Sequence, residues 1–224
     1  MAAGLLDAPP RLLDPHRANG HTRPPLPPPG GDGEGPEPAP RRRLDNLRVA
    51  LLFFMGAESM FFAALISALF ILRLGMPVWP PPLQPRLPLG VTTANTVVLL
   101  CSSVAMFRAG RALARDDRLR LVRWLTVAAI LGGIFLAVQG YEWVQLVHFG
   151  LTMSSSTYGT TFYTLIGTHA LHVAGALVWL VALLGLALAK RVSRERGTAV
   201  RGCVLYWNFV VGLWPILFVA VYLL

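Results

Sequence analysis

The sequence predicts an all-α integral membrane protein, a five-helix bundle preceded by a disordered tail. Charged residues make up only 14% of the 224 residues, against about a quarter in soluble domains. Five apolar runs follow one another after residue 48, and each is long enough to cross a hydrocarbon layer of about 30 Å as a helix. Positive residues gather in alternate connections between these runs, as they do in membrane proteins.

Residues 1–43 form the predicted tail. They hold more than half of the chain's 18 prolines, together with scattered charges of both signs. Such a segment cannot bury enough apolar surface to offset the entropy of ordering it, so we expect disorder. It also lacks the apolar core and small-residue cleavage site of a secretory signal. The transmembrane domain is therefore expected over 44–224.

The five apolar runs predict helices at about 49–72, 89–107, 124–147, 160–189 and 203–224. A helix is required because backbone polar groups in lipid must find partners within their own segment. The second run is the shortest and contains Thr92, Thr93, Asn95 and Thr96. The connection HFGLTMSSSTYGT before the fourth run offers serines and threonines that can cap a helix.

The distribution of positive residues predicts the orientation. Segments 41–48, 108–123 and 190–202 would lie on one side and hold nearly all arginines of this region, whereas Arg73 and Arg86 lie on the other. The positive-inside rule places the tail in the cytoplasm and the C-terminus outside. A net charge of +9 could indicate nucleic-acid binding, but these arginines occupy short connections and form no basic domain, so we expect no nucleic-acid partner.

Four ionisable residues lie within the apolar runs: Glu58, Glu142, His169 and His172. A charge at mid-bilayer costs at least ~2.5 kcal/mol, so these residues are functional candidates. At about 1.5 Å per residue, Glu58 and the two histidines lie at similar depth, and Glu142 lies nearer the outer face. A contact between Glu58 and a histidine of the fourth run is allowed, and it would reduce the cost of either charge.

The same residues do not predict a redox centre. Histidines three apart on one helix cannot bind opposite sides of one haem iron, the two glutamates differ in depth, and no HExxH motif occurs. Cys101 and Cys203 lack metal-type spacing. We therefore expect no catalytic, cofactor-binding or metal-ligating residues in this chain. A proton path and polar packing stay open as roles for the four residues.

Small residues four apart predict places of close helix approach. They are Ala63 with Ser67 and Ala64 with Ala68 in the first run, and Ala170 with Ala174 in the fourth.

Four stretches of the sequence together resemble subunit III of the haem-copper terminal oxidases. They are GAESMFFAALISALFILR, WPPPLQPRLPLGVTTANTVVLLCSS, QGYEWVQLVHFGLTMSSSTYGTTFYTLIGTHALHV and YWNFVVGLW. The first resembles the family's helix with an intramembrane glutamate, and the second its proline-rich loop and Asn-Thr-x-x-Leu-Leu helix. The last two are similar to its long signature and its C-terminal Tyr-Trp-His-Phe motif. The resemblance covers residues 50–224, in the family's order.

The resemblance implies an accessory subunit without haem or copper, both of which belong to subunits I and II. Such a subunit packs on subunit I, holds phospholipid, and supports proton uptake and stable turnover. Carried over by position, Glu58, Asn95, Glu142, His169, His172 and Asn208 would be buried polar residues in contact with lipid or neighbouring subunits. The expected location is the inner membrane of a bacterium, and a chain with Lys190 as its only lysine is typical of a GC-rich bacterial genome.

Two departures from the family pattern leave alternatives open. Longer members have seven helices, of which this chain matches the last five, and Asn208 and Val211 replace the usual His and Asp of the last motif. A subunit III-like component of another respiratory complex, such as a nitric oxide reductase, is one alternative. A self-contained small transporter is another, disfavoured because no internal repeat or matched pair of broken helices occurs.

Overall fold

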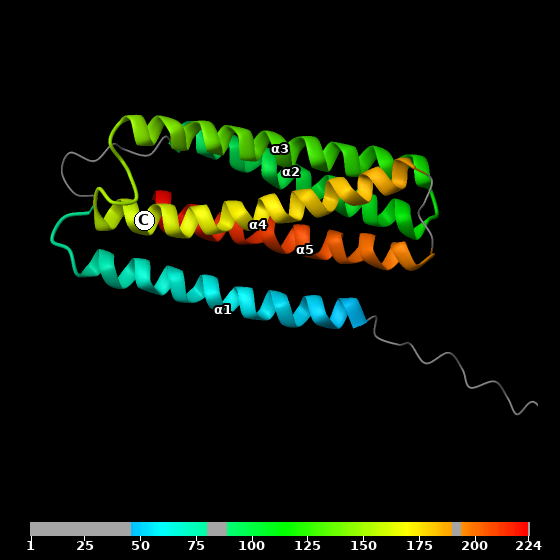
Figure 1. The fold of residues 1–224 in the computed structure, drawn as a ribbon, viewed down its shortest axis with the longest axis horizontal. Helices are drawn as coiled ribbons and strands as arrows, with labels where there is room; N and C mark the ends of the chain where they lie inside the picture. The colour runs from blue at the N-terminus through cyan, green and yellow to red at the C-terminus, as the bar shows by residue number, and fades with distance from the viewer. Residues whose placement is uncertain (1–45, 80–88, 190–193, 224) are drawn as a thin grey trace, which may run out of the picture. The chain divides into compact units, whose positions relative to one another are not determined.

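The structure is a computed structural model that describes residues 46–79, 89–189 and 194–223. The predicted tail over 1–43, most of the proline-rich connection, and Lys190 and Arg191 lie outside the described residues. Five helices follow in order (Figure 1), α1 (Asn46–Leu74), α2 (Leu89–Ala114), α3 (Arg118–His148), α4 (Thr157–Leu188) and α5 (Arg194–Phe218), with a π-helical turn at Val219–Leu223. Each is long and apolar enough to cross a membrane. The prediction of an all-α chain with five membrane-spanning helices is confirmed.

The helices continue beyond the apolar runs into the arginine-rich connections. Arginine, leucine and alanine are good helix formers, and the predicted connection 108–123 is helical except for a tight turn at 115–117. Asp116 adopts a left-handed conformation there (φ 55°), and the side chain of Asp117 caps α3 by accepting a hydrogen bond from the Arg120 N–H at 3.0 Å. Ser156 caps α4 in the same way, as the sequence predicted.

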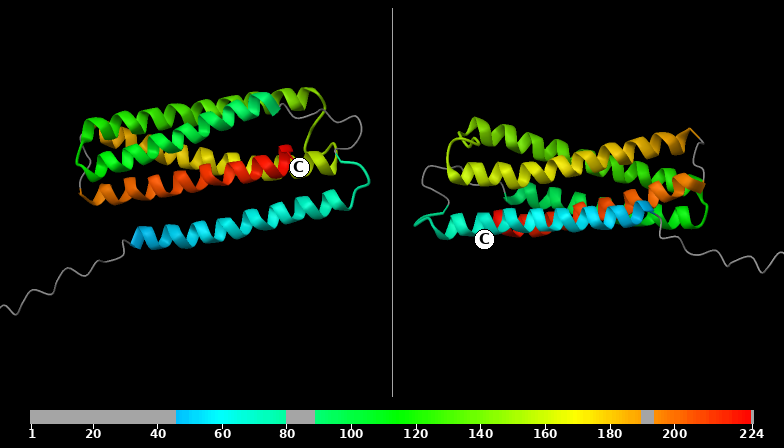
Figure 2. Two further views of the ribbon diagram at one scale, coloured as in Figure 1. Left: turned by 180° about the vertical axis from the view of Figure 1, so that it is seen from behind. Right: turned by 60° about the horizontal axis from the view of Figure 1, so that its bottom comes forward.

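Helix α1 lies at the edge of the helical domain, beside α5 and α4 (Figures 1 and 2). The α2–α3 hairpin forms the most extensive helix pair, and α4 and α5 pack on it. The buried face of α1 is narrow and consists of Leu51, Glu58, Phe62 and Leu69. A helix attached through so few side chains depends strongly on each of them.

Helix α5 is fixed to α2 by two tryptophans whose indole N–H groups reach buried hydroxyls. Trp207 donates to Ser102 at 3.1 Å, and Trp214 donates to Thr96 at 2.8 Å. These pairs satisfy polar groups in a region without water, where an unpaired donor would cost about 1–3 kcal/mol. They therefore select one register between the two helices.

The small-residue pairs of α1 make no close contact with another helix of this chain. Ala63, Ala64, Ser67 and Ala68 are all exposed on the described surface, because the buried face of α1 is occupied by larger side chains. Close approach occurs instead at single glycines. The ring of Trp207 fills the space where Gly132 would carry a Cβ, and Leu51 of α1 packs over Gly202 in the same manner.

Replacing Gly132 with alanine is expected to destabilise the domain because the added methyl collides with the rigid Trp207 ring. Overpacking of this kind costs about 1–3 kcal/mol. Gly133→Ala is the matched control, since its Cβ would meet no atom within 4 Å and both changes bring the same gain in helix propensity. The comparison is made by thermal unfolding of the purified protein in detergent. Equal midpoints for the two variants would contradict this packing.

Candidate functional site

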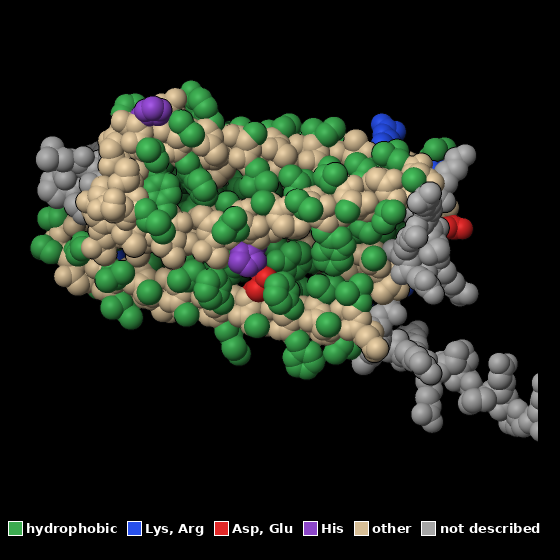
Figure 3. All heavy atoms as spheres, viewed as in Figure 1, with side chains coloured by type: hydrophobic (Ala, Val, Ile, Leu, Met, Phe, Trp, Pro, Cys, Tyr) green, Lys and Arg blue, Asp and Glu red, His purple; other side chains and the backbone are tan. Residues whose placement is uncertain are grey.

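The carboxylate of Glu58 lies between three helices, with its side chain only 6% exposed. The Tyr206 hydroxyl of α5 donates to Glu58 Oε1 at 3.0 Å. The Nε2 atom of His172, from α4, lies 3.3 Å from the same oxygen. Figure 3 shows a histidine and an acidic side chain meeting on a face covered mainly by hydrophobic side chains. The contact between Glu58 and a histidine of the fourth run, which depth allowed, is thus present.

The second ring nitrogen of His172 restricts the protonation of this cluster. Nδ1 lies 2.7 Å from the carbonyl oxygen of Thr168, and a carbonyl can only accept, so Nδ1 carries a hydrogen. Nε2 is the ring nitrogen that faces the Glu58 carboxylate. Glu58 Oε2 has no hydrogen-bond partner in the described part of the chain.

His169 points away from this cluster into the core. It is fully buried, and its ring stacks on Trp214 with centroids 5.2 Å apart and meets the edge of Phe62 at 6.2 Å. Neither ring nitrogen has a hydrogen-bond partner among the described residues. Two aromatic rings thus pack against this imidazole. Over those residues, no three His, Cys, Asp or Glu side chains are grouped as metal ligands.

The other predicted site residues occupy separate positions. Asn95 of α2 is buried and donates through Nδ2 to the carbonyl of Phe135 on α3 at 3.0 Å. Glu142 is half-buried near the end of α3. Asn208 of α5 accepts from the hydroxyl of Ser103 and donates to its own helix at the carbonyl of Val204. The structure therefore joins Glu58 with His172 and leaves the remaining candidates apart.

Two polar side chains of the core are not among the predicted site residues. Tyr206 supplies the hydrogen bond to Glu58. Gln139 is buried in the core, and its Nε2 has no hydrogen-bond partner among the described residues. Gln139 could have been found as an uncharged polar residue within an apolar run. Tyr206 could not, because tyrosine is common at membrane interfaces.

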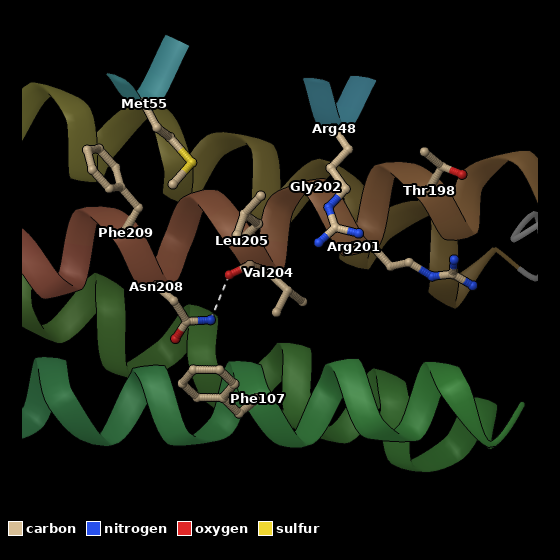
Figure 4. Close-up of a pocket in the computed structure, with 10 residues that line it drawn as sticks. All are labelled: Arg48, Met55, Phe107, Thr198, Arg201, Gly202, Val204, Leu205, Asn208 and Phe209. Atoms are coloured by element: carbon tan, nitrogen blue, oxygen red, sulfur yellow. Dashed lines mark hydrogen bonds between the residues drawn. The ribbon is translucent and has the colours of Figure 1, made fainter. Parts of the chain in front are cut away.

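A groove runs between α1 and α5 beside the Glu58 cluster. One part has a volume of about 590 Å³ and is lined by Arg48 and Met55 of α1, Phe107 of α2, and Thr198, Arg201, Gly202, Val204, Leu205, Asn208 and Phe209 of α5. Figure 4 shows Arg48 extending from α1 toward α5, near Gly202. A further part, of about 480 Å³, shares Asn208 and Phe209 and continues between α1 and α5 to Ile216. The groove thus has two arginines at one end and apolar walls along its length.

The sequence is similar to the sequences of known proteins. The family model described as cytochrome c oxidase subunit III matches residues 42–224. The chain is 37% identical over 175 residues to the cytochrome c oxidase subunit 3 of Synechocystis sp., which covers 78% of this chain and 74% of that protein. Identity is 36% over 182 residues to a probable cytochrome c oxidase subunit 3 of Nocardia farcinica (80% and 89% covered). It is 35% over 184 residues to the cytochrome c oxidase subunit 3 of Corynebacterium diphtheriae (80% and 89%).

The residues matched by the family model include all five helices. With a family model spanning the helical domain and relatives above the level of identity at which folds and families are shared, the chain belongs to the cytochrome c oxidase subunit III family.

Proposed function

We propose that this chain is the non-catalytic accessory subunit of a respiratory haem-copper oxidase in the inner membrane of a bacterium. Its role is to stabilise subunit I, while haem and copper are held by subunits I and II. The observation that carries this proposal is the Glu58 cluster, where a buried carboxylate joins α1 to α4 and α5. Buried polar contacts of this kind hold helices together in a region where lipid competes equally for apolar surface.

Two further features are consistent with this role. The names of the relatives favour an oxidase over a nitric oxide reductase complex. Arginines lie at the end of α2 and at the start of α3. By the positive-inside rule, they favour a cytoplasmic location for the turn between these two helices. In this orientation the Glu58 cluster would lie within the membrane beside subunit I, where it supports proton uptake during oxygen reduction.

The groove between α1 and α5 is the proposed site of bound phospholipid. Its walls are apolar along the helices, and Arg48 and Arg201 at one end offer donors to a phosphate group. Guanidinium groups bind phosphate oxygens through charge-assisted hydrogen bonds. Acyl chains would fill the continuation toward Gly212 and Ile216 and would keep α1 attached along a face where it has few direct contacts.

Glu58→Ala is expected to shorten the time over which the purified oxidase sustains turnover, without loss of haem. The substitution leaves the Tyr206 hydroxyl and the His172 ring without their partner, which costs about 1–3 kcal/mol for a buried group. The measurements are the total oxygen reduced before inactivation and the haem content of the same preparation.

Ser67→Ala serves as the control for that experiment. Ser67 also belongs to α1, is exposed, lines neither part of the groove, and bonds to its own helix at the carbonyl of Ala63. Glu58→Gln retains an acceptor for Tyr206 and should recover part of the lost stability. Complete loss of haem in Glu58→Ala would contradict an accessory role, because it would place this residue in support of the redox centre itself.

Gly212→Leu is expected to reduce the phospholipid that the purified complex retains, because the new side chain enters the groove from α5. Gly212 lines the groove, and its Cβ would meet no atom within 4 Å, so the change should not disturb packing. Gly175→Leu places the same side chain on an exposed face of α4, also free of nearby atoms. Phospholipid is counted by mass spectrometry after detergent washing. Equal retention in both variants would exclude the groove as the lipid site.

A further inference from the structure

A second pocket lies at the turn between α2 and α3, away from the groove along α1 and α5. It has a volume of about 180 Å³ and is lined by Arg108, Arg111, Ala112, Arg115, Asp117, Arg120 and Trp124. Arg108 and Arg111 stand three apart on α2, so they share one face of the helix, and Arg115 follows in the turn. The pocket therefore collects positive side chains from both helices of a rigid hairpin.

The positive charge of this pocket is only partly neutralised. Arg120 pairs with Asp117, with its Nε 3.1 Å from Oδ2, and Asp117 is also the cap of α3. Asp116, the neighbouring carboxylate at the turn, is not part of the lining. Four guanidinium groups thus surround one lining carboxylate. Their mutual repulsion is relieved when an anion occupies the space between them.

The chemistry of the lining suits a phosphate group. Arg108 lies over the ring of Trp124, with Cζ 4.7 Å from the ring centroid. This cation–π contact restrains the orientation of the Arg108 guanidinium group. Arginine forks bind phosphate oxygens in bidentate geometry. The volume corresponds to about six water molecules at about 30 Å³ each, enough for a phosphate group with its oxygens.

The positive-inside rule alone does not explain why these arginines line one pocket. Arg118 belongs to the same hairpin, but it donates to the carbonyls of Ala187 and Leu188 and so closes the end of α4. The pocket arginines converge on a shared space instead. Retention of a protein segment on the cytoplasmic side requires positive residues near the membrane, and it does not require that they face one another.

We propose that this pocket binds the phosphate of an anionic membrane phospholipid. The pocket lies where two membrane-spanning helices end, which is the depth of lipid headgroups, and Trp124 provides the aromatic side chain typical of that level. Basic pockets between helices on the cytoplasmic side are known to hold anionic headgroups. This site uses other helices and other residues than the groove beside α1, so it does not depend on the proposed function.

The test is a titration of the purified complex with dioctanoyl phosphatidylglycerol, followed by native mass spectrometry. Each of Arg111→Gln and Arg115→Gln is expected to weaken binding about fivefold, since one arginine near an anionic surface contributes about 1 kcal/mol. The double variant should show about the product of the two. Both side chains are exposed, so the single variants are expected to fold even if the double variant does not.

Arg123→Gln is the matched control, because Arg123 is exposed on α3 but does not line the pocket. Arg201→Gln tests that the groove beside α1 does not contribute to the signal. Binding by the pocket variants within twofold of the unmodified complex would overturn the proposal. Equal binding of dioctanoyl phosphatidylcholine would overturn it as well, and so would full displacement of the lipid by an equal concentration of pyrophosphate, which would indicate a site for a soluble anion.

Discussion

The attachment of α1 depends on one buried carboxylate. Glu58 receives the hydroxyl of Tyr206 and faces the ring of His172, so a single side chain connects α1 with both α5 and α4. In a membrane, apolar contact between helices gains little over contact with lipid tails, and polar contacts weigh more heavily in specifying a position. The other buried residues of α1 are apolar, and among them Phe62 packs against His172 of α4 and Leu51 over Gly202 of α5.

The remaining helices are held together in a different way. Indole N–H groups of α5 bond to hydroxyls of α2, and Asn95 of α2 bonds to the backbone of α3. These bonds lie deep in the core, whereas the Glu58 contact lies at its edge. The groove reflects this difference. Glu58 holds α1 against α4 and α5, whereas the space lined by Arg48, Phe107 and Asn208 stays open. An accessory subunit of this form offers both a firm core and an edge that a lipid or neighbouring subunit can complete.

Much of the fold could be predicted from the sequence, because length and apolar character suffice to identify membrane-spanning helices. The sequence also predicted that Glu58 and the two histidines lie at similar depth and can meet, since the depth of a residue in a helix follows from the residue count. Which histidine would meet Glu58 could not be predicted: residues three apart lie only about 60° apart around a helix, and only the packed structure directs His169 to Trp214 and His172 to Glu58. The small pairs of α1 make no close contact within this chain, because spacing alone does not say which helix face is buried. Gly132 was missed because its role depends on Trp207 of a helix distant in sequence.

A double-mutant cycle between Glu58 and Tyr206 tests the central claim most directly. Glu58→Ala, Tyr206→Phe and the double variant would be compared in the free energy of unfolding of the purified complex in a denaturing detergent. If the bond attaches α1, the two single losses are not additive, and the coupling free energy should reach about 1 kcal/mol, as for a buried hydrogen bond. Additive losses, within about 0.5 kcal/mol, would show that the bond between Glu58 and Tyr206 does not hold α1 in place.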